Sequence, residues 1–210
     1  MEKQKKCQLV LIRHGESEGN KGHRFSGTND DLLTAKGINQ ALEAGYTLRN
    51  ANFDFGFTSN LRRSADTLNI ILSVMGYDVP ITALVGLNER NYGILQGMER
   101  KEAIEKFGRD NVELWKNSYS IGPENGENLT DVYNRVSVTF KANILPKLIL
   151  SQNVIVACHN GSLRALIRNI ENADPDYVAK MSIENCKPIT YEFDCQKNTF
   201  VRLDDIPKAL

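Results

Sequence analysis

The sequence predicts an α/β fold, a three-layer α/β/α sandwich with a mainly parallel sheet and a candidate active site at the C-terminal edge of its strands. Two observations predict this fold. Short runs that are apolar on both faces, at residues 9–12 and 154–158, are typical of strands covered by helices on both sides. These runs alternate with longer segments whose apolar residues recur at helical spacing, as in sheets whose parallel strands are joined by helices.

The elements of the first half follow from local signals. Thr34 is a residue type that caps helices, and it begins a helix expected to run to about Leu48. The expected apolar positions of this helix are Ile38, Ala41, Leu42, Gly45 and Tyr46. Residues 53–60 (FDFGFTSN) predict a second strand and a turn, in which Ser59 or Asn60 caps the following helix. The apolar face of that helix is expected at Leu61, Ala65, Leu68 and Leu72.

The second half of the chain continues the same alternation. A helix is expected from about Leu129 to Ile144, disturbed near Pro146 because proline lacks a backbone N–H. Its apolar positions include Val132, Val136 and Phe140. The remaining elements are a buried strand, a helix and two closing strands that we expect to be antiparallel at an edge, at residues 154–158, 161–169, 190–194 and 200–203.

Composition argues against several classes of function. The chain has 210 residues, of which 41% are hydrophobic, so it can bury a substantial core, and we expect one domain over residues 1–210. Lys plus Arg equals Asp plus Glu at 26 each, so no overall field attracts nucleic acid or an anionic membrane. Any anion-binding site must therefore be local.

We expect neither a targeting segment nor a membrane span. The N-terminal MEKQKK is followed by too few apolar residues for a signal peptide, and no apolar stretch approaches the ~20 residues that cross a bilayer. The cysteines have no metal-ligand spacing, which is typical of reduced thiols; they are Cys7, Cys158, Cys186 and Cys195. The sequence thus predicts a soluble, cytoplasmic protein.

Two of the predicted strands end in a histidine. Arg13, His14 and Gly15 follow the first strand, which places an imidazole able to act as a nucleophile beside a guanidinium. His159 follows the second buried strand in the same way, and the backbone N–H groups near Gly161 could bind an anion. Each histidine alone could be only a polar stop, a cap or a core residue. Their matching positions favour one shared site.

Two further polar segments could complete that site. Arg62 and Arg63 fall in the first turn of a helix, where the macrodipole disfavours a cation by roughly 0.3–1 kcal/mol. A nearby anion should therefore offset this unfavourable interaction, or one of the two side chains points into water. Helical periodicity does not settle the direction of Arg63. The polar loop at residues 85–97 carries Glu89, which could act as a general acid and base near a phosphate or form an ordinary surface ion pair.

The strings LIRHGESEGN, RFSGTND, TSNLRRSADT, LNERNYG and CHNGSLRAL occur in the order and approximate spacing of one known family. Over roughly residues 8–195, the chain resembles the cofactor-dependent phosphoglycerate mutases, members of the histidine phosphatase superfamily. RHG marks only the superfamily, whereas FSG and LNERNYG point to the mutase branch.

The resemblance implies a role for each matching residue. It makes His14 the nucleophile that becomes phosphohistidine, with His159, Arg13 and Arg63 holding the transferring phosphoryl group. Glu89 resembles the general acid and base of the family. The implied substrate-binding residues are Gly15, Glu16, Ser17, Glu18, Gly19, Asn20, Ser26, Gly27, Arg90, Asn91, Tyr92, Arg100, Lys116, Asn117, Asn160 and Gly161.

The resemblance also implies a reaction, the interconversion of 3-phosphoglycerate and 2-phosphoglycerate in glycolysis and gluconeogenesis. A phosphohistidine primed by 2,3-bisphosphoglycerate would carry the phosphoryl group, and no metal is implied, because arginines and a histidine can meet the charge. The expected partners are small phosphorylated three-carbon acids, and the chain could also form a homo-oligomer.

The sequence departs from the family pattern on the lid side of the pocket. Arg100 stands where such mutases commonly have lysine, and Lys116 and Asn117 stand where they have two arginines, so one cation is missing. The usual order of glycine and asparagine is reversed at Asn160 and Gly161. The segment that ends in GPENGENL is also shorter than in many relatives.

A thinner lid admits water to phosphohistidine, so a histidine phosphatase that hydrolyses small phosphate esters is the alternative function. A non-catalytic module that binds phosphometabolites is a third hypothesis. Its signature would be the loss of His14, His159 or Glu89, and all three are present. Of the remaining residues, His23 is expected in a loop or at the pocket rim, and Trp115 is expected in the core.

Overall fold

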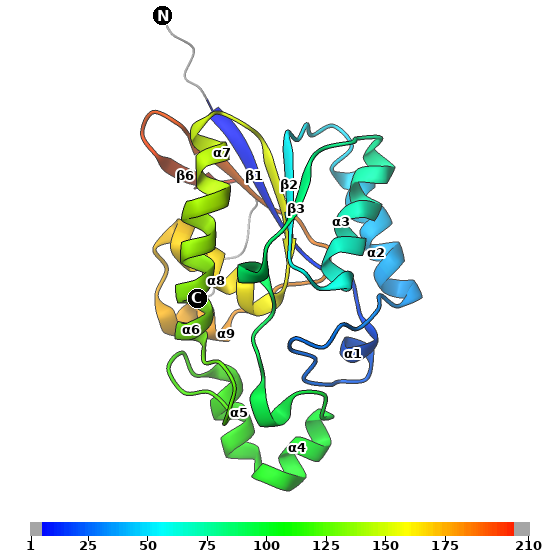
Figure 1. Cartoon of the computed structure of the whole chain (residues 1–210), viewed down its shortest axis with the longest axis vertical. Coiled ribbons are helices and arrows are strands. Elements are labelled where there is room, and N and C mark those ends of the chain that lie inside the picture. Colours follow the sequence, from blue (N-terminus) through cyan, green and yellow to red (C-terminus); the bar gives the residue numbers. More distant parts are fainter. Residues whose placement is uncertain (1–5, 204–210) are drawn as a thin grey trace, which may run out of the picture.

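A computed structural model describes residues 6–203, which form one six-stranded sheet (Figure 1). Its strands are β1 (Lys6–Arg13), β2 (Phe55–Thr58), β3 (Ile81–Ala83), β4 (Val154–Cys158), β5 (Ile189–Asp194) and β6 (Thr199–Arg202). Their order is β3-β2-β4-β1-β5-β6; the first four are parallel, whereas β5 and β6 are antiparallel additions at one edge. The expected mainly parallel sheet and antiparallel edge are confirmed. The segment MEKQKK, apart from Lys6, lies outside the described residues.

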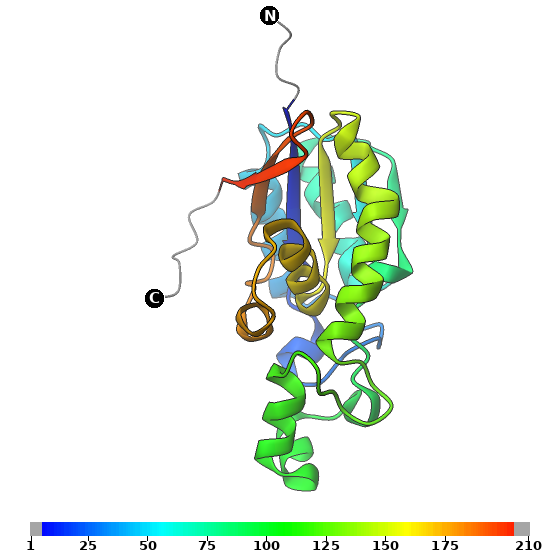
Figure 2. The ribbon, with the colours of Figure 1, turned by 90° about the vertical axis from the view of Figure 1, so that its left-hand side faces the viewer.

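Helices cover both faces of the sheet (Figures 1 and 2). They are α1 (Glu18–Lys21), α2 (Ala35–Thr47), α3 (Arg62–Met75), α4 (Arg100–Phe107), α5 (Arg109–Asn117), α6 (Leu129–Thr139), α7 (Leu145–Ile149), α8 (Asn160–Glu171) and α9 (Pro175–Lys180). In β1, Leu9 and Leu11 pack into the core shared with α6 and α8, whereas Val10 and Ile12 pack into the core shared with α2 and α3. The three layers are therefore confirmed. Within residues 6–203, no helix has both the length and the apolar character that crossing a membrane requires.

The buried face of α2 differs from the expected one. Thr34 caps the helix as expected, its side chain accepting from the Gly37 N–H. However, Ile38 and Tyr46 are 42% and 60% exposed, and the buried residues are Gly37, Ala41, Ala44 and Gly45. Small residues are needed there because a Cβ at Gly37 would overlap the Glu16 backbone. Close packing against the first loop thus overrides the pattern of larger apolar residues.

The long helix of the second half is disturbed where expected. Between α6 and α7, residues Phe140–Ile144 form a π-helical turn, and Pro146 lies in the first turn of α7. Proline cannot donate to the carbonyl four residues earlier, so the hydrogen-bond pattern shifts at this point. Figure 2 shows that these three pieces still run on as one rod along the sheet.

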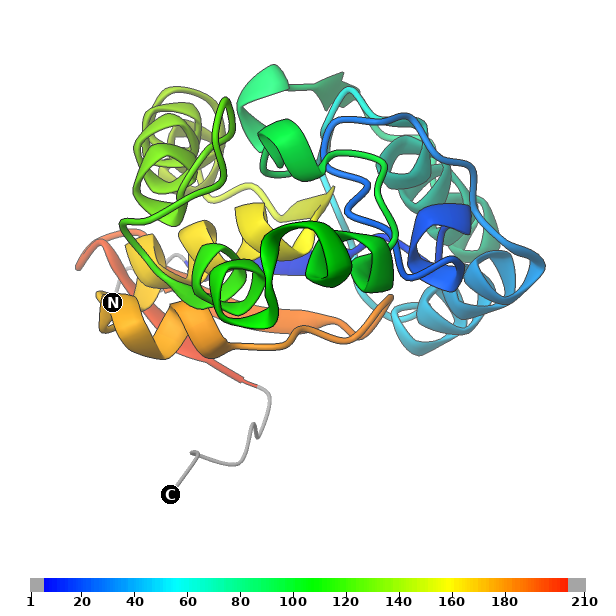
Figure 3. The same cartoon turned by 90° about the horizontal axis from the view of Figure 1, so that it is seen from below.

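A second, smaller core lies beyond the C-terminal ends of the parallel strands. It is formed by α4, α5 and the loops beside them (Figure 3), around Phe25, Leu95, Ala103 and Val112. Trp115 packs on it with its ring tilted 67° to that of Phe107. This core places α5 beyond the edge of the sheet at which β1 and β4 end (Figures 1 and 3).

Candidate active site

The two histidines follow neighbouring parallel strands. Arg13 at the end of β1 is paired with Cys158 at the end of β4, and the His14 N–H donates to the Cys158 carbonyl at 3.0 Å. The two strands end at the same level of the sheet, so the ring centroids of His14 and His159 lie 5.0 Å apart. The matching positions in the sequence therefore correspond to one site.

His14 is arranged as a neutral nucleophile. Its Nδ1 lies 2.7 Å from the Gly15 carbonyl oxygen, and because a carbonyl only accepts, Nδ1 carries the proton. Nε2 keeps its lone pair and accepts from Arg63 Nε at 3.3 Å. Burial, followed by the charges of Arg63 and Arg13, holds the pKa of His14 well below its ordinary value. Nε2 is therefore available for attack at neutral pH.

His159 is held by Ser59, which the sequence predicts as a possible helix cap. Its Nε2 lies 2.7 Å from Ser59 Oγ, and that hydroxyl also accepts from the Leu61 N–H at 3.1 Å. The expected capping of α3 by Ser59 or Asn60 is wrong, because Leu61 occupies the cap position and makes no side-chain cap bond. The other ring nitrogen, Nδ1, is buried with no hydrogen-bond partner among the described residues, so its hydrogen-bonding capacity is unused.

The two buried rings should make the fold sensitive to acid. Burial, then the charges of Arg63, His14 and Arg13, also holds the pKa of His159 well below 6.5. Below pH 6.5 the histidines bind protons in the unfolded state but stay neutral in the folded state. The free energy of unfolding should therefore fall by up to about 1.4 kcal/mol per pH unit for each histidine. Urea unfolding between pH 7.5 and 5 measures this slope, and His14→Gln should reduce it. A level curve over this range would contradict the neutral assignment.

Arg63 turns inward and Arg62 turns outward. Arg63 is 1% exposed and donates through Nη1 to the Asn29 carbonyl at 2.6 Å and through Nη2 to the Gly27 carbonyl at 2.8 Å. The expected nearby anion is Asp30, whose Oδ1 accepts from the Arg62 N–H at 2.6 Å. Arg63 thus connects the nucleophile with the loop before α2, while Arg62 reaches solvent.

Glu89 lies against the first turn of α8. Its Oε1 accepts from the Gly161 N–H at 3.0 Å and from the Arg90 N–H at 2.8 Å. A Cβ at Gly161 would overlap this carboxylate, which explains why glycine stands there and Asn160 comes first. Asn160 instead accepts from the Ile183 N–H through Oδ1 at 3.2 Å. The reversed order in the sequence therefore leaves room for Glu89.

A cavity of about 410 Å³ opens at this edge and brings together most of the predicted site residues. Those on its lining are Arg13, His14, Asn20, Ser26, Gly27, Arg63, Glu89, Tyr92, Arg100, Lys116, Asn117 and Asn160. Those set back from the lining are Gly15, Glu16, Ser17, Glu18, Gly19, Arg90, Asn91, His159 and Gly161. His23 lies on the lining, at the rim position expected for it.

Five lining residues were not among the predicted ones: Arg24, Phe25, Arg164, Lys180 and Ser182. Arg164 could have been found, because it lies on the helix that follows His159 and is almost as buried, at 8% exposure. Its guanidinium donates to the Met181 carbonyl. Lys180 gives no such signal, since it ends an unremarkable short helix.

The lining is strongly positive in a chain with no net charge. In the part of the chain that the structure describes, a single carboxylate, that of Glu89, lines the cavity beside seven cations: Arg13, Arg24, Arg63, Arg100, Lys116, Arg164 and Lys180. Two of them are paired elsewhere, Arg24 with Glu99 and Arg100 with Glu113. Among residues 6–203, no group of three or more His, Cys, Asp or Glu side chains could hold a metal ion. The site can therefore bind an anion that carries several charges.

Comparison with protein families and known sequences gives a consistent result. The model of the histidine phosphatase superfamily (branch 1) matches residues 9–206. The 2,3-bisphosphoglycerate-dependent phosphoglycerate mutase of Xanthobacter autotrophicus is 42% identical over 187 residues, which are 88% of this chain and 90% of that protein. The phosphoglycerate mutase of Schizosaccharomyces pombe is 41% identical over 89% of this chain and 90% of its own.

Solved structures share the fold at lower identity. The alpha-ribazole phosphatase from Shigella flexneri has a TM-score of 0.82 and 24% identity, covering 93% of this chain and 94% of that one. A phosphoglycerate mutase from Bacillus anthracis has a TM-score of 0.77 and 20% identity, covering 96% and 93%. A mutase and a phosphatase thus share this architecture, so the arrangement of the site must distinguish their activities.

Proposed function

Because the chain belongs to the histidine phosphatase superfamily, we propose that it interconverts 3-phosphoglycerate and 2-phosphoglycerate through a phosphohistidine at His14. The observation that carries this proposal is the neutral imidazole of His14, whose unprotonated Nε2 accepts from Arg63 in a cavity lined by cations. Relatives at about 40% identity over most of the chain are named as phosphoglycerate mutases. The reaction belongs to glycolysis and gluconeogenesis.

The site suits a small, highly charged acid such as 2,3-bisphosphoglycerate. Cations reach the cavity from β1, α3, α5 and α8, on several sides of His14. When bound, 2,3-bisphosphoglycerate supplies the phosphoryl group that primes the enzyme. Arg13, Arg63 and His159 would hold the three oxygens of the transferring phosphoryl group, with the free Nδ1 of His159 as one donor.

His14 would then carry the phosphoryl group, and Glu89 would transfer the proton. Nε2 of His14 attacks the phosphorus with its lone pair, the bond from phosphorus to the substrate oxygen breaks, and protonated Glu89 gives its proton to that oxygen. In the reverse direction, the Glu89 carboxylate takes the proton of a substrate hydroxyl, which attacks the phosphohistidine and restores neutral His14. Each transfer leaves Glu89 ready for the next, so one carboxyl group serves both directions.

The remaining predicted binding residues take part in the same proposal. Asn20, Ser26, Gly27, Tyr92 and Arg100, with Lys116, Asn117 and Asn160, would contact the substrate directly from the lining. Gly15 to Gly19 would shape the first loop, and Arg90 would support Tyr92, over whose ring its guanidinium lies at 4.5 Å. A cytoplasmic location, a homo-oligomer and a single domain over residues 1–210 stay predictions.

A coupled assay tests the function. Conversion of 3-phosphoglycerate to 2-phosphoglycerate is measured with and without 2,3-bisphosphoglycerate, beside the release of phosphate from the same substrates. We expect isomerisation that 2,3-bisphosphoglycerate stimulates and that a metal chelator leaves unchanged. Rapid phosphate release without isomerisation would contradict the proposal and favour a phosphatase of small phosphate esters.

A further inference from the structure

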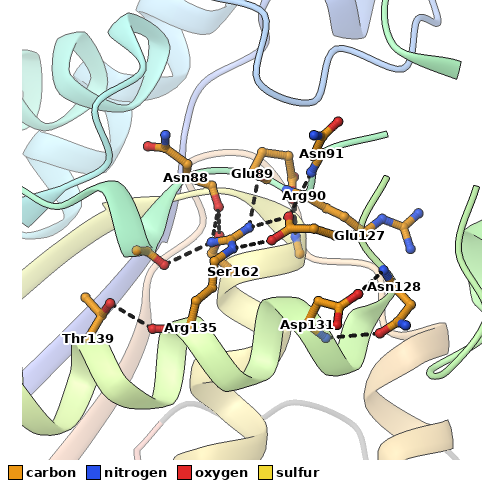
Figure 4. A network of polar contacts seen from close by, with 12 residues as sticks. Asn88, Glu89, Arg90, Asn91, Glu127, Asn128, Asp131, Arg135, Thr139 and Ser162 are labelled. Atoms are coloured by element: carbon orange, nitrogen blue, oxygen red, sulfur yellow. Dashed lines mark hydrogen bonds and ion pairs between the residues drawn. The ribbon is translucent and has the colours of Figure 1, made fainter. Parts of the chain in front are cut away.

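The loop that carries Glu89 is held from outside the cavity by Arg135 of α6. The guanidinium of Arg135 uses all five of its N–H donors (Figure 4). Three go to backbone carbonyl oxygens of the loop, of Gly86 at 3.0 Å, of Asn88 at 2.9 Å and of Glu89 itself at 3.2 Å. The other two go to the carboxylate of Glu127, at 2.7 and 2.9 Å.

Glu127 in turn binds the far end of the loop. Its Oε2 accepts from the Asn91 N–H at 2.9 Å, and its own N–H donates to the Asn91 carbonyl at 2.8 Å. Burial alone raises the pKa of Glu127, but the bonds from Arg135 and Asn91 outweigh this effect, and the pKa lies below its ordinary value. Glu127 is therefore an anion that connects Arg135 with the residues after Glu89.

The loop is clamped between two helices. From α8, Ser162 Oγ donates to the Asn88 carbonyl at 2.6 Å, and Arg135 binds the same oxygen from α6. Within residues 6–203, the Glu89 carboxylate itself accepts only from backbone N–H groups, those of Gly161 and Arg90. The position of the carboxylate in the cavity thus depends on the position of the loop backbone. Arg135 holds that backbone through the hydrogen bonds to its carbonyl groups.

We propose that Arg135 and Glu127 are positioning residues for Glu89, which hold its carboxylate where it can exchange a proton with the substrate oxygen. The inference rests on the general acid and base role proposed above for Glu89. Glu127 also lies in the short segment that follows Lys116 and Asn117, so its side chain and its backbone both join this segment to the loop that carries Glu89.

Dependence on the leaving group distinguishes this role from a structural one. Phosphorylation of His14 by 2,3-bisphosphoglycerate expels an alkoxide, which needs a proton from Glu89, whereas acetyl phosphate expels acetate, which needs none. A displaced Glu89 should therefore slow the first reaction and spare the second. A general loss of folded structure would slow both equally.

The experiment measures the single-turnover rate of phosphoenzyme formation from each donor in Arg135→Lys, Glu127→Gln and the reference Glu89→Gln. Lysine keeps the charge of Arg135 but not its five-donor fork. We expect Glu89→Gln to lose about 10²–10⁴-fold with 2,3-bisphosphoglycerate. The two positioning variants should lose on the order of 10–10²-fold. All three should stay within about twofold of the parent with acetyl phosphate.

Glu171→Gln is the matched control. It breaks the ion pair of Glu171 with Arg202, whose side chains are 27% and 18% exposed, against 25% and 24% for Glu127 and Arg135. This pair joins β6 to the end of α8, away from the Glu89 loop. The control should keep both rates.

The rates with the two phosphoryl donors separate a positioning role of Arg135 and Glu127 from a structural one. Selective loss in both positioning variants, with no further loss when either is combined with Glu89→Gln, supports the inference. Equal loss with both donors, or no loss with either, overturns it even if the variants fold normally. If Glu89→Gln itself shows no selective loss, the proposed role of Glu89 fails instead.

Discussion

His14→Ala is expected to abolish the acid-labile phosphoprotein and to lower turnover by at least about 10⁴-fold, since the variant lacks the proposed nucleophile of the covalent step. We do not expect the neighbouring ring to substitute for it, because Ser59 lies at His159 Nε2 and the proposal uses His159 Nδ1 as a proton donor. Incubation with radiolabelled 2,3-bisphosphoglycerate, followed by acid and base treatment of the protein, measures the modification. Label should reach one phosphoryl group per chain in the parent and be absent from the variant.

Persistent acid-labile label in His14→Ala would refute the assignment of the nucleophile. Thermal unfolding of the variant provides the control, because it shows whether the loss of the ring affects the fold. Residue 14 is also held by hydrogen bonds of its backbone. The N–H of His14 donates to Cys158, and its carbonyl accepts from the Asn185 side chain at 2.6 Å, and the alanine variant keeps both bonds. We therefore expect the variant to fold.

Arg63→Lys should lower kcat/KM by about 10²–10³-fold, although it keeps the positive charge. Lysine cannot donate at once to His14, Asn29 and Gly27, so the nucleophile loses its orientation and the loop before α2 loses its support. Steady-state kinetics with 3-phosphoglycerate measure the effect.

Arg62→Lys is the control for this change, since Arg62 occupies the adjacent position in the same helical turn and its side chain is exposed. Its kcat/KM should stay within about twofold of the parent, because exposed charges contribute little. Equal losses in the two variants would mean that charge in this turn matters more than the geometry of Arg63.

The positions of both histidines could be predicted from the sequence because they depend on local signals. An apolar run on both faces predicts a buried strand, and the first polar residues after it must lie at the edge. His14 and His159 share that signal, and residues 9–12 and 154–158 are indeed the neighbouring strands β1 and β4. The strand β3 was missed because Ile81, Thr82 and Ala83 are all exposed and lack this pattern.

Other features depend on contacts between distant segments and leave no local signal. The direction of Arg63 is set by carbonyl groups of the loop containing Gly27, more than thirty residues earlier. Ser59 belongs to a residue type that caps helices, but a histidine one hundred residues later in the chain uses its hydroxyl instead. Arg164 and Lys180 come together at the cavity only after α8 and α9 have packed.

The backbone bond from His14 to Cys158 has a consequence for the motions of the protein. β1 and β4 are the two middle strands, each with a neighbour on both sides, and the amide of His14 is bonded where they end, so its proton should exchange with solvent more slowly than the amide protons of the surrounding loops. Local fluctuations of the loops can admit and release ligands, but they cannot separate the two imidazoles. The sheet therefore holds the backbones of the two catalytic residues together, while the loops around them account for the motions of ligand entry and release.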